Sequence, residues 1–125
     1  MGNKKKGIKA ERELFHILWD KEFAVVRVAG SGCMPEPSCD LLAGNGERAF
    51  AIEVKTSREK RKYITKEQVS EFIKFSKKFG LQPLIALKFM RTEWLFVYPE
   101  HLEDTGKNFA ISIEKANELN LKIIN

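Results

Sequence analysis

Apolar residues recur at helical spacing over residues 8–21 and again over residues 65–80, with polar residues between them. Such a repeat places apolar side chains on one face of a helix, so both segments are predicted to be amphipathic helices. Gly80 is suited to end the second helix in a left-handed cap. Ser112 is suited to begin a short helix over residues 113–119. The pattern therefore predicts three helices.

Short apolar runs bounded by turn residues lie between these helices, which is typical of strands. The pair Asn45 and Gly46 between two such runs predicts a tight hairpin, so its two strands are expected to be antiparallel. The expected strands are residues 23–28, 40–44, 48–55, 83–90 and 93–99. With 125 residues, the chain has room for one packed domain. We therefore expect an α/β fold, a single domain with a central mixed five-stranded β-sheet flanked by helices.

The expected strand over residues 48–55 contains two charged residues in an otherwise apolar run. Side chains of a strand alternate between its two faces. Ile52 and Val54 therefore share one face, whereas Glu53 and Lys55 lie on the other. The apolar face is expected to pack on a helix, and the other face presents a carboxylate and an ammonium about 6.6 Å apart along the backbone.

Asp40 opens the strand before the hairpin, and pairing across the hairpin would bring its carboxylate close to Glu53. Two neighbouring carboxylates repel each other, and a divalent cation between them allows both to stay ionised. Oxygen ligands with several waters suit Mg²⁺ or Mn²⁺, and such an ion activates water for attack on a phosphodiester. Lys55 would stabilise the charge that develops on the phosphate, or position the water. The pattern indicates a metal-dependent phosphodiesterase, although Glu53 and Lys55 also fit an ordinary solvated strand face.

Glu11 lies on the apolar side of the first expected helix, three and four residues before Leu14 and Phe15. A carboxylate on an inward face is usually paired or functional, because burying it alone is costly. Glu11 is therefore a third candidate acid.

Positive charge is gathered in two segments, residues 3–9 and 55–62, and the net charge is +5 with a pI near 9.2. Clustered basic charge is expected of a protein that binds a polyanion, although solubility alone also explains it. No apolar run reaches the roughly 18 residues that span a bilayer. The lysines near the start are not followed by the apolar segment of a secretory signal. A cytoplasmic protein without membrane contact is expected.

The two cysteines, Cys33 and Cys39, lie in one loop. They are too few for a four-ligand zinc site, and neither histidine has the spacing of a zinc finger. A loop disulfide and two free thiols both remain possible, and no catalytic role is expected for either residue.

Several ordered motifs resemble the archaeal Holliday junction resolvase (Hjc) family, a branch of the PD-(D/E)xK nuclease superfamily, whose fold is like that of type II restriction endonucleases. The later segments PLIALKFM and EWLFVYP match the remaining strands of the family more loosely. The matching stretches are KGIKAEREL at 6–14, FAVVRVAGSG at 23–32, DLLAGNG at 40–46, AIEVK at 51–55 and EFIKFSKKFG at 71–80.

The resemblance implies a role for each acid of the candidate site. Asp40 and Glu53 would bind the metal ion together with the backbone carbonyl of Val54, and Lys55 would be the catalytic lysine. Glu11 would join the metal ligands directly or through water. The implied cofactor is Mg²⁺, for which Mn²⁺ would substitute.

The resemblance also implies residues that contact DNA or a second subunit. Ser31 matches a serine near the active site of the family, in a loop that is longer here, and it joins the expected catalytic set. Phe75 and Phe79 match aromatic residues at a dimer interface, with Phe75 expected to make the larger contact. Gln68 is expected to point toward the site. The expected DNA contacts, from the resemblance and the basic segments, are Lys5, Lys6, Arg12, Arg27, Arg58, Lys60, Arg61 and Lys62.

The expected function is a homodimeric, structure-selective endonuclease that resolves four-way (Holliday) DNA junctions by paired nicks during recombination and repair. Simpler interpretations remain for single residues: Arg12 and Arg27 fit solvated positions, and Ser31 fits a turn between glycines. The alternatives for the whole chain are a related nuclease that acts on other DNA and a nuclease-fold protein that only binds DNA.

Overall fold

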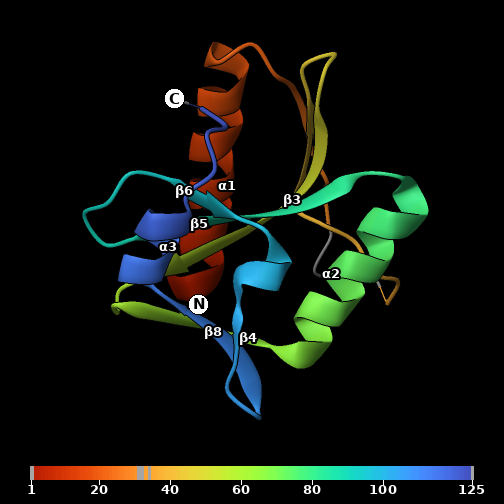
Figure 1. Ribbon diagram of the computed structural model, residues 1–125. Helices are drawn as coiled ribbons and strands as arrows, with labels where there is room; N and C mark the ends of the chain where they lie inside the picture. Colours follow the sequence, from red (N-terminus) through yellow and green to blue (C-terminus); the bar gives the residue numbers. More distant parts are fainter. Residues whose placement is uncertain (1, 31–32, 34, 125) are drawn as a thin grey trace.

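The computed structural model describes residues 2–30, 33 and 35–124, and for residues 2–6 it describes the backbone alone. The chain forms a mixed sheet with helices packed against it (Figure 1). The helices are α1 (Gly2–Asp20), α2 (Lys66–Phe79) and α3 (Ile113–Leu119), with one 3₁₀ turn, η1 (Pro99–His101). The strands are β1 (Ala24–Arg27), β2 (Leu41–Gly44), β3 (Ala49–Ser57), β4 (Arg61–Thr65), β5 (Gln82–Phe89), β6 (Leu95–Val97), β7 (Glu103–Asp104) and β8 (Asn108–Ser112).

The main sheet has five strands in the order β1-β2-β3-β5-β6. β3 and β5 are parallel, and the other neighbouring pairs are antiparallel. The predicted hairpin joins β2 to β3: Gly46 has a φ of 92°, and the Asn45 side chain accepts hydrogen bonds from the backbone N–H groups of Glu47 (2.9 Å) and Arg48 (2.8 Å). The expected α/β fold with a mixed five-stranded sheet is confirmed.

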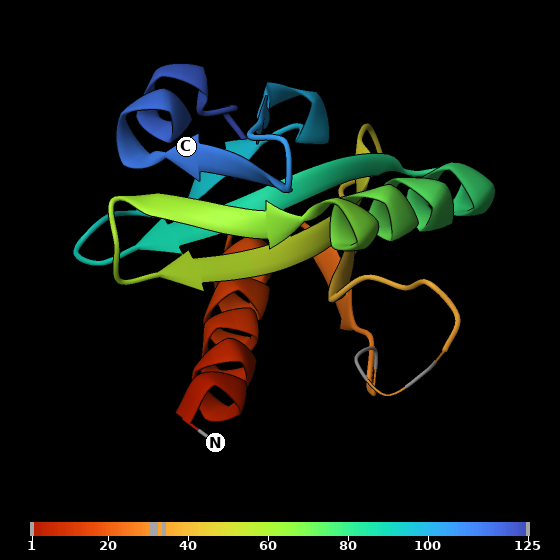
Figure 2. The ribbon, with the colours of Figure 1, turned by 90° about the horizontal axis from the view of Figure 1, so that it is seen from below.

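Both faces of the main sheet are covered. On one face, Leu14 and Leu18 of α1 pack in a core that contains Ile52 of β3. On the other face, Val69 and Phe72 of α2 pack in a second core. Figure 2 shows α1 on one side of the strands and β8 with α3 on the other. The predicted alternation along β3 therefore holds, because Phe50, Ile52 and Val54 belong to the α1 side and Ala51 to the α2 side.

The bounds of α2 follow from its two ends. The Thr65 side chain accepts a hydrogen bond from the N–H of Gln68 (3.1 Å), which caps the start of the helix. Gly80 ends it in the left-handed region with a φ of 88°, and its N–H donates to the carbonyls of Ser76 (3.0 Å) and Lys77 (3.2 Å). The expected helix over residues 65–80 and its glycine cap are confirmed.

A second sheet was not predicted from the sequence. Its three strands lie in the order β4-β8-β7, with antiparallel pairing throughout. β4 begins in the basic segment, and its first residues, Arg61 and Lys62, hide the strand pattern. The first helix also begins earlier than expected, at Gly2. Within the described residues, no helix is long and apolar enough to cross a membrane.

Candidate active site

Asp40 lies directly before β2 and is held against β3. Its N–H donates to the carbonyl of Ile52 (3.1 Å), and its Oδ2 accepts a hydrogen bond from the N–H of Val54 (2.8 Å). Leu41 pairs with Ile52 across the two strands, so Asp40 stands opposite the Glu53 position. The predicted approach of these two carboxylates is confirmed by this register.

Glu53 and Lys55 lie together on the face of β3 that α2 covers. The Glu53 Oε2 and the Lys55 Nζ are 3.9 Å apart, and their side chains are only 20% and 18% exposed. Burial, followed by the charge of Asp40, raises the pKa of Glu53 to about 8, although Lys55 acts in the opposite direction. Without a cation, the pair of carboxylates therefore does not carry two full negative charges at neutral pH.

Glu11 reaches the same site from α1. Its Oε1 accepts a hydrogen bond from Nη2 of Arg27 (3.4 Å), which forms an ion pair between α1 and β1. Burial and the charge of Asp40 raise the pKa of Glu11, whereas Arg27 lowers it. The Nε of Arg27 is buried without a hydrogen-bond partner among the described residues. The predicted inward position of Glu11 is confirmed.

These groups line a cavity of about 300 Å³ at the start of β2 and the middle of β3. Gln68 also lines it, as predicted. The other lining residues are Glu11, Ser38, Cys39, Asp40, Glu53, Val54 and Lys55. A partly buried carboxylate pair, a lysine and an amide thus face one solvent-connected space.

The donor set fits a hard divalent cation with few protein ligands. In the described part of the chain, no three His, Cys, Asp or Glu side chains are grouped so as to hold a metal ion by themselves. Glu11 is engaged by Arg27, so Asp40 and Glu53 are the acids that could bind an ion directly, and Val54, whose carbonyl the resemblance implies as a ligand, also lines the cavity. Mg²⁺ typically keeps several waters and uses one or two carboxylates, and it would relieve the repulsion that raises the Glu53 pKa.

Both cysteines are free thiols, with Cys33 exposed and Cys39 buried. The Cys39 Sγ donates to the carbonyl of Leu41 (3.3 Å), and burial raises its pKa to about 12. A thiol with this pKa stays protonated at neutral pH in the metal-free protein.

The expected DNA-binding residues fall into different surroundings. Ser31 and the side chains of Lys5 and Lys6 lie outside the described residues, so their predicted roles stay predictions. Arg12 is exposed on α1, and Arg27 is partly buried. Arg58 and Lys60 are exposed, Arg61 pairs with Glu103 (2.7 Å), and Lys62 is partly buried.

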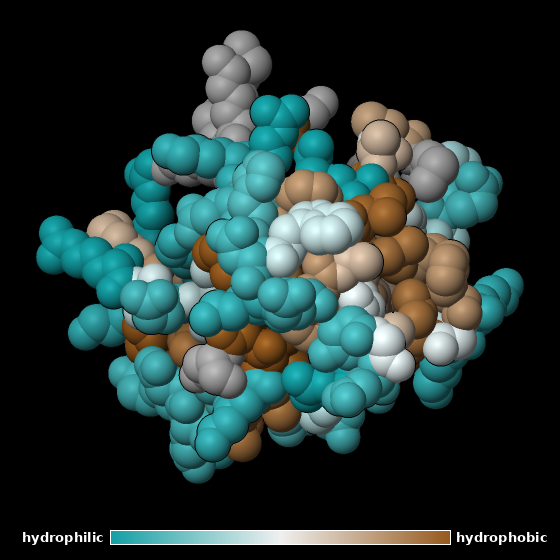
Figure 3. Space-filling view, turned by 90° about the horizontal axis from the view of Figure 1, so that it is seen from above, coloured by the Kyte–Doolittle hydropathy of each residue, from teal (hydrophilic) through white to brown (hydrophobic). Residues whose placement is uncertain are grey.

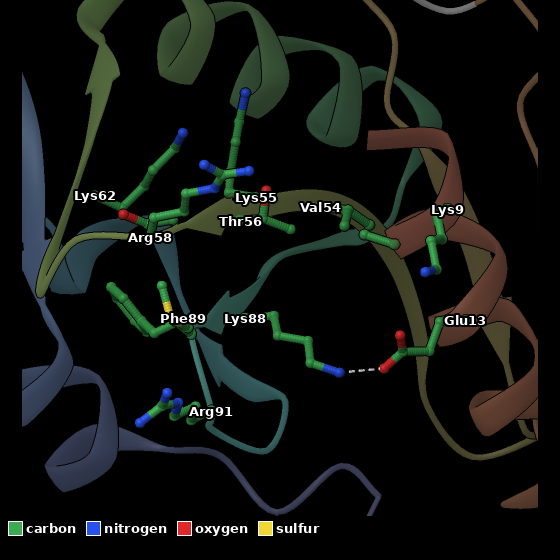
Figure 4. A pocket seen from close by; sticks show the side chains of 13 residues that line it. Lys9, Glu13, Val54, Lys55, Thr56, Arg58, Lys62, Lys88, Phe89 and Arg91 are labelled. Atoms are coloured by element: carbon green, nitrogen blue, oxygen red, sulfur yellow. Dashed lines mark hydrogen bonds and ion pairs between the residues drawn. The ribbon is translucent and has the colours of Figure 1, made fainter. Parts of the chain in front are cut away.

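A second cavity of about 590 Å³ adjoins the first and shares Val54 and Lys55 with it. Figure 4 shows Lys55, Arg58 and Lys62 on one side of the β3 ribbon, with Lys88 and Glu13 on the other. Six of its lining residues are cationic and only one is acidic. The cations are Lys9, Lys55, Arg58, Lys62, Lys88 and Arg91.

Sequence reasoning missed Lys9, Lys88 and Arg91 in this cavity. Lys88 Nζ donates to Oε1 of Glu13, which also accepts a hydrogen bond from Nε1 of Trp94 (3.0 Å). Lys88 interrupts an apolar run, as Lys55 does, so the same sequence pattern indicates Lys88 as a candidate functional residue. Its location depends on the parallel pairing of β3 with β5, which places Lys88 beside Thr56.

The two expected interface residues differ in exposure. Phe79 is 58% exposed, whereas Phe75 is partly buried against the core on the α2 side, and their ring centroids are 5.6 Å apart. Phe75 was expected to make the larger interface contact, but Phe79 presents the larger apolar surface in the single chain.

Comparisons with known proteins identify the family of the chain. A family model described as "Archaeal holliday junction resolvase (hjc)" matches residues 2–124. The crossover junction endodeoxyribonuclease Hjc of Archaeoglobus fulgidus is 42% identical over 120 residues, covering 96% of this chain and 88% of that protein. The protein of the same name from Methanocaldococcus jannaschii is 41% identical over 107 residues, covering 86% of this chain and 76% of that protein.

A solved structure supports the same assignment. The structure of Archaeoglobus fulgidus Hjc, described as a Holliday junction resolvase from an archaeal hyperthermophile, superposes with a TM-score of 0.84 at 42% identity. The match covers 91% of this chain and 92% of that one. The fold, the order of motifs and the whole-length similarity lead to one conclusion: the chain belongs to the archaeal Holliday junction resolvase (Hjc) family.

Proposed function

We propose that this chain, over residues 1–125, is a structure-selective endonuclease that cuts four-way DNA junctions during recombination and repair. The observation that carries the proposal is the partly buried pair Asp40 and Glu53 with Lys55 beside them, in a family whose named members are crossover junction endodeoxyribonucleases. A DNA-binding module has no need to hold two carboxylates whose burial and proximity raise the pKa of Glu53 to about 8. The proposal includes a cytoplasmic location, where the substrate would be found.

Membership in a nuclease family implies a divalent metal ion, and we propose Mg²⁺, with Mn²⁺ as a substitute. Asp40, Glu53 and the carbonyl of Val54 would hold it, and Glu11 would contribute through water because Arg27 already engages its carboxylate. When bound, the ion supplies positive charge that polarises a phosphate oxygen and lowers the pKa of a bound water.

The protein side chains would supply the remaining electrostatic work. Lys55 lies next to Glu53, so its ammonium would stabilise the negative charge that builds up on the attacked phosphate, or orient the water. The Arg27 side chain is partly exposed beside Glu11, and its guanidinium would contact a phosphate oxygen. Ser31 belongs to the proposed catalytic set because of the family resemblance.

The DNA backbone would follow the basic surface around this site. Arg12 is an exposed cation of α1, and Arg58 and Lys60 are exposed cations just beyond the end of β3. All three suit phosphate contacts that position the duplex without reading its sequence. Lys5 and Lys6 would extend the same surface at the N-terminus. Arg61 would exchange its ion pair with Glu103 for a phosphate contact.

A homodimer completes the proposal, because two nicks in strands of like polarity require two sites related by a two-fold axis. Phe79, together with the edge of Phe75, offers an apolar surface at the end of α2. The space-filling view shows apolar side chains gathered on the right of the molecule, on the side where α2 ends (Figure 3). An apolar patch of this kind is typical of an interface.

The test compares a labelled four-way junction with a linear duplex of the same sequence, in Mg²⁺ and in EDTA. We expect cleavage of the junction alone, in Mg²⁺ alone. Equal cleavage of both substrates would favour a related nuclease that acts on other DNA. Tight binding of the junction without cleavage in Mg²⁺ or Mn²⁺ would favour a protein that only binds DNA.

A further inference from the structure

Lys62 points inward from β4. Along this strand, Arg61, Tyr63 and Thr65 are exposed, whereas Lys62 is partly buried and Ile64 is buried. Since strand side chains alternate, Lys62 shares the inner face of β4 with Ile64. An inward lysine on a strand is unusual unless its charge has a partner or a task.

No carboxylate among the described residues forms an ion pair with Lys62. Its outward neighbour Arg61, in contrast, pairs with Glu103 and lies over the ring of Tyr63. Burial lowers the pKa of Lys62, and the charge of Lys55 lowers it further. The two ammonium groups therefore repel each other. Lys55 has the Glu53 carboxylate 3.9 Å from its Nζ, whereas Lys62 has no ion-pair partner among the described residues.

The cavity that Lys62 lines is the place where an anion would pair with its ammonium group. Lys55 and Lys62 line the space of about 590 Å³, and Arg58 lies beside them (Figure 4). Val54 and Lys55 also line the smaller cavity with Asp40 and Glu53. A strand whose phosphate lies over the two carboxylates would therefore continue into the larger cavity, toward Lys62.

We propose that Lys62 binds the phosphodiester next to the scissile one, on the strand that is cut, and so positions that strand over Lys55. This inference rests on the proposed nuclease function. It separates Lys62 from Arg58, Lys60 and Arg61, whose exposed side chains suit contacts with the outer DNA backbone. The repulsion between Lys55 and Lys62 would be relieved when consecutive phosphates enter the cavity.

The first experiment compares Lys62→Gln with Lys107→Gln, a matched variant that removes the same charge at an exposed position in the turn between β7 and β8. Single-turnover cleavage of the junction, at saturating enzyme in Mg²⁺, should fall about tenfold or more for Lys62→Gln and little for Lys107→Gln. Lys62→Arg should recover part of the rate. Equal effects of the two glutamine variants would overturn the proposal.

The second experiment measures binding in EDTA, so it does not depend on the metal ion. Junctions carry one neutral methylphosphonate, at the position on either side of the cleaved phosphate or at a distant position. At one adjacent position the wild type should lose about tenfold in affinity, and Lys62→Gln should lose none. A loss of the same size in both proteins would show that Lys62 does not contact that phosphate.

A stability measurement separates this role from a structural one. Lys62→Met keeps the apolar stem and removes a partly buried charge, so its Tm should equal or exceed that of the wild type. A lower Tm would make Lys62 a structural residue and contradict the proposal. Failure of the wild type to cut the junction would instead overturn the proposed function, so the two failures are distinguishable.

Discussion

At the residue scale, two neighbours act on the ionisation of Glu53 in opposite directions. Asp40 and burial raise its pKa, and Lys55 lowers it, with a net value of about 8. In the metal-free protein, Glu53 therefore holds a proton at neutral pH. A divalent ion reverses this balance because it favours the charged form of both carboxylates.

The metal-free protein should lose stability as the pH rises from about 4.5 to about 8. An unfolded chain releases the Glu53 proton near the ordinary value of 4.5, whereas the folded chain keeps it until about 8, so the folded state binds the proton more tightly in this window. The stabilising contribution is complete below 4.5 and lost above 8. Thermal denaturation in EDTA at a series of pH values measures this slope.

Glu53→Gln cannot titrate, so it should flatten that slope and be more stable than the wild type at pH 8. Glu47→Gln, at an exposed glutamate of the β2–β3 hairpin, is the matched control and should keep the wild-type slope. An unchanged slope in Glu53→Gln would show that another group causes the pH dependence.

Asp40→Asn should separate cleavage from binding. The amide is a poor metal ligand, so junction cleavage should fall by more than about a hundredfold. Removing a negative charge that faces the phosphates should leave junction binding in EDTA near the wild-type value, or tighter. Gel-shift titration and a cleavage time course measure the two quantities, and cleavage near the wild-type rate would rule out Asp40 as a metal ligand.

At the element scale, the two helices that cover the sheet were predictable because their sequences carry local signals. The apolar repeat located α1 and α2, and Gly80 located the end of α2. β3 was predictable for the same reason, since alternation alone separates Ile52 from Glu53.

The second sheet was not predictable from such signals. β4 reads as a basic loop because Arg61 and Lys62 open it, and β7 has only two residues. Their strand character depends on pairing with β8, more than 40 residues beyond β4. The ion pair between Glu13 and Lys88 was not predictable for the same reason, because 75 residues separate the two in the sequence.

Gly80→Ala should destabilise the protein by about 1 kcal/mol, because an alanine at a φ of 88° is strained. A Cβ at this position would meet no atom within 4 Å, so the effect is conformational rather than steric. Gly7→Ala is the matched control: Gly7 lies within α1 without positive φ, also in open space. It should stabilise by about 0.5–1 kcal/mol. Urea denaturation measures both changes, and the same sign for both would contradict the explanation.

At the scale of the whole molecule, each chain holds the carboxylate pair Asp40 and Glu53 where β2 and β3 meet. The cationic surface extends from this point around the ends of β3 and β5. The end of α2 carries the exposed ring of Phe79. A two-fold dimer through that region would carry two cutting sites, one for each of two opposed strands of a junction.

Phe79→Glu should therefore convert a dimer into a monomer, because it places a charge in an apolar interface. Met90→Glu is the matched control, since Met90 is similarly exposed (55%, against 58% for Phe79) but lies at the end of β5. Sedimentation without DNA should give a dimer for the wild type and for Met90→Glu, and a monomer at micromolar concentration for Phe79→Glu.

The same Phe79→Glu variant tests whether the two nicks are coupled. On a supercoiled plasmid that extrudes a cruciform, paired nicks within one encounter give a linear product, whereas independent nicks first release the supercoils and give an open circle. Once the supercoils are released, the cruciform arms return to ordinary duplex, so no junction remains for a second nick. The wild type should produce mainly linear DNA and Phe79→Glu mainly open circles, with its folded state checked by thermal denaturation. Linear product from a protein that sediments as a monomer would contradict both the dimer and the paired cleavage.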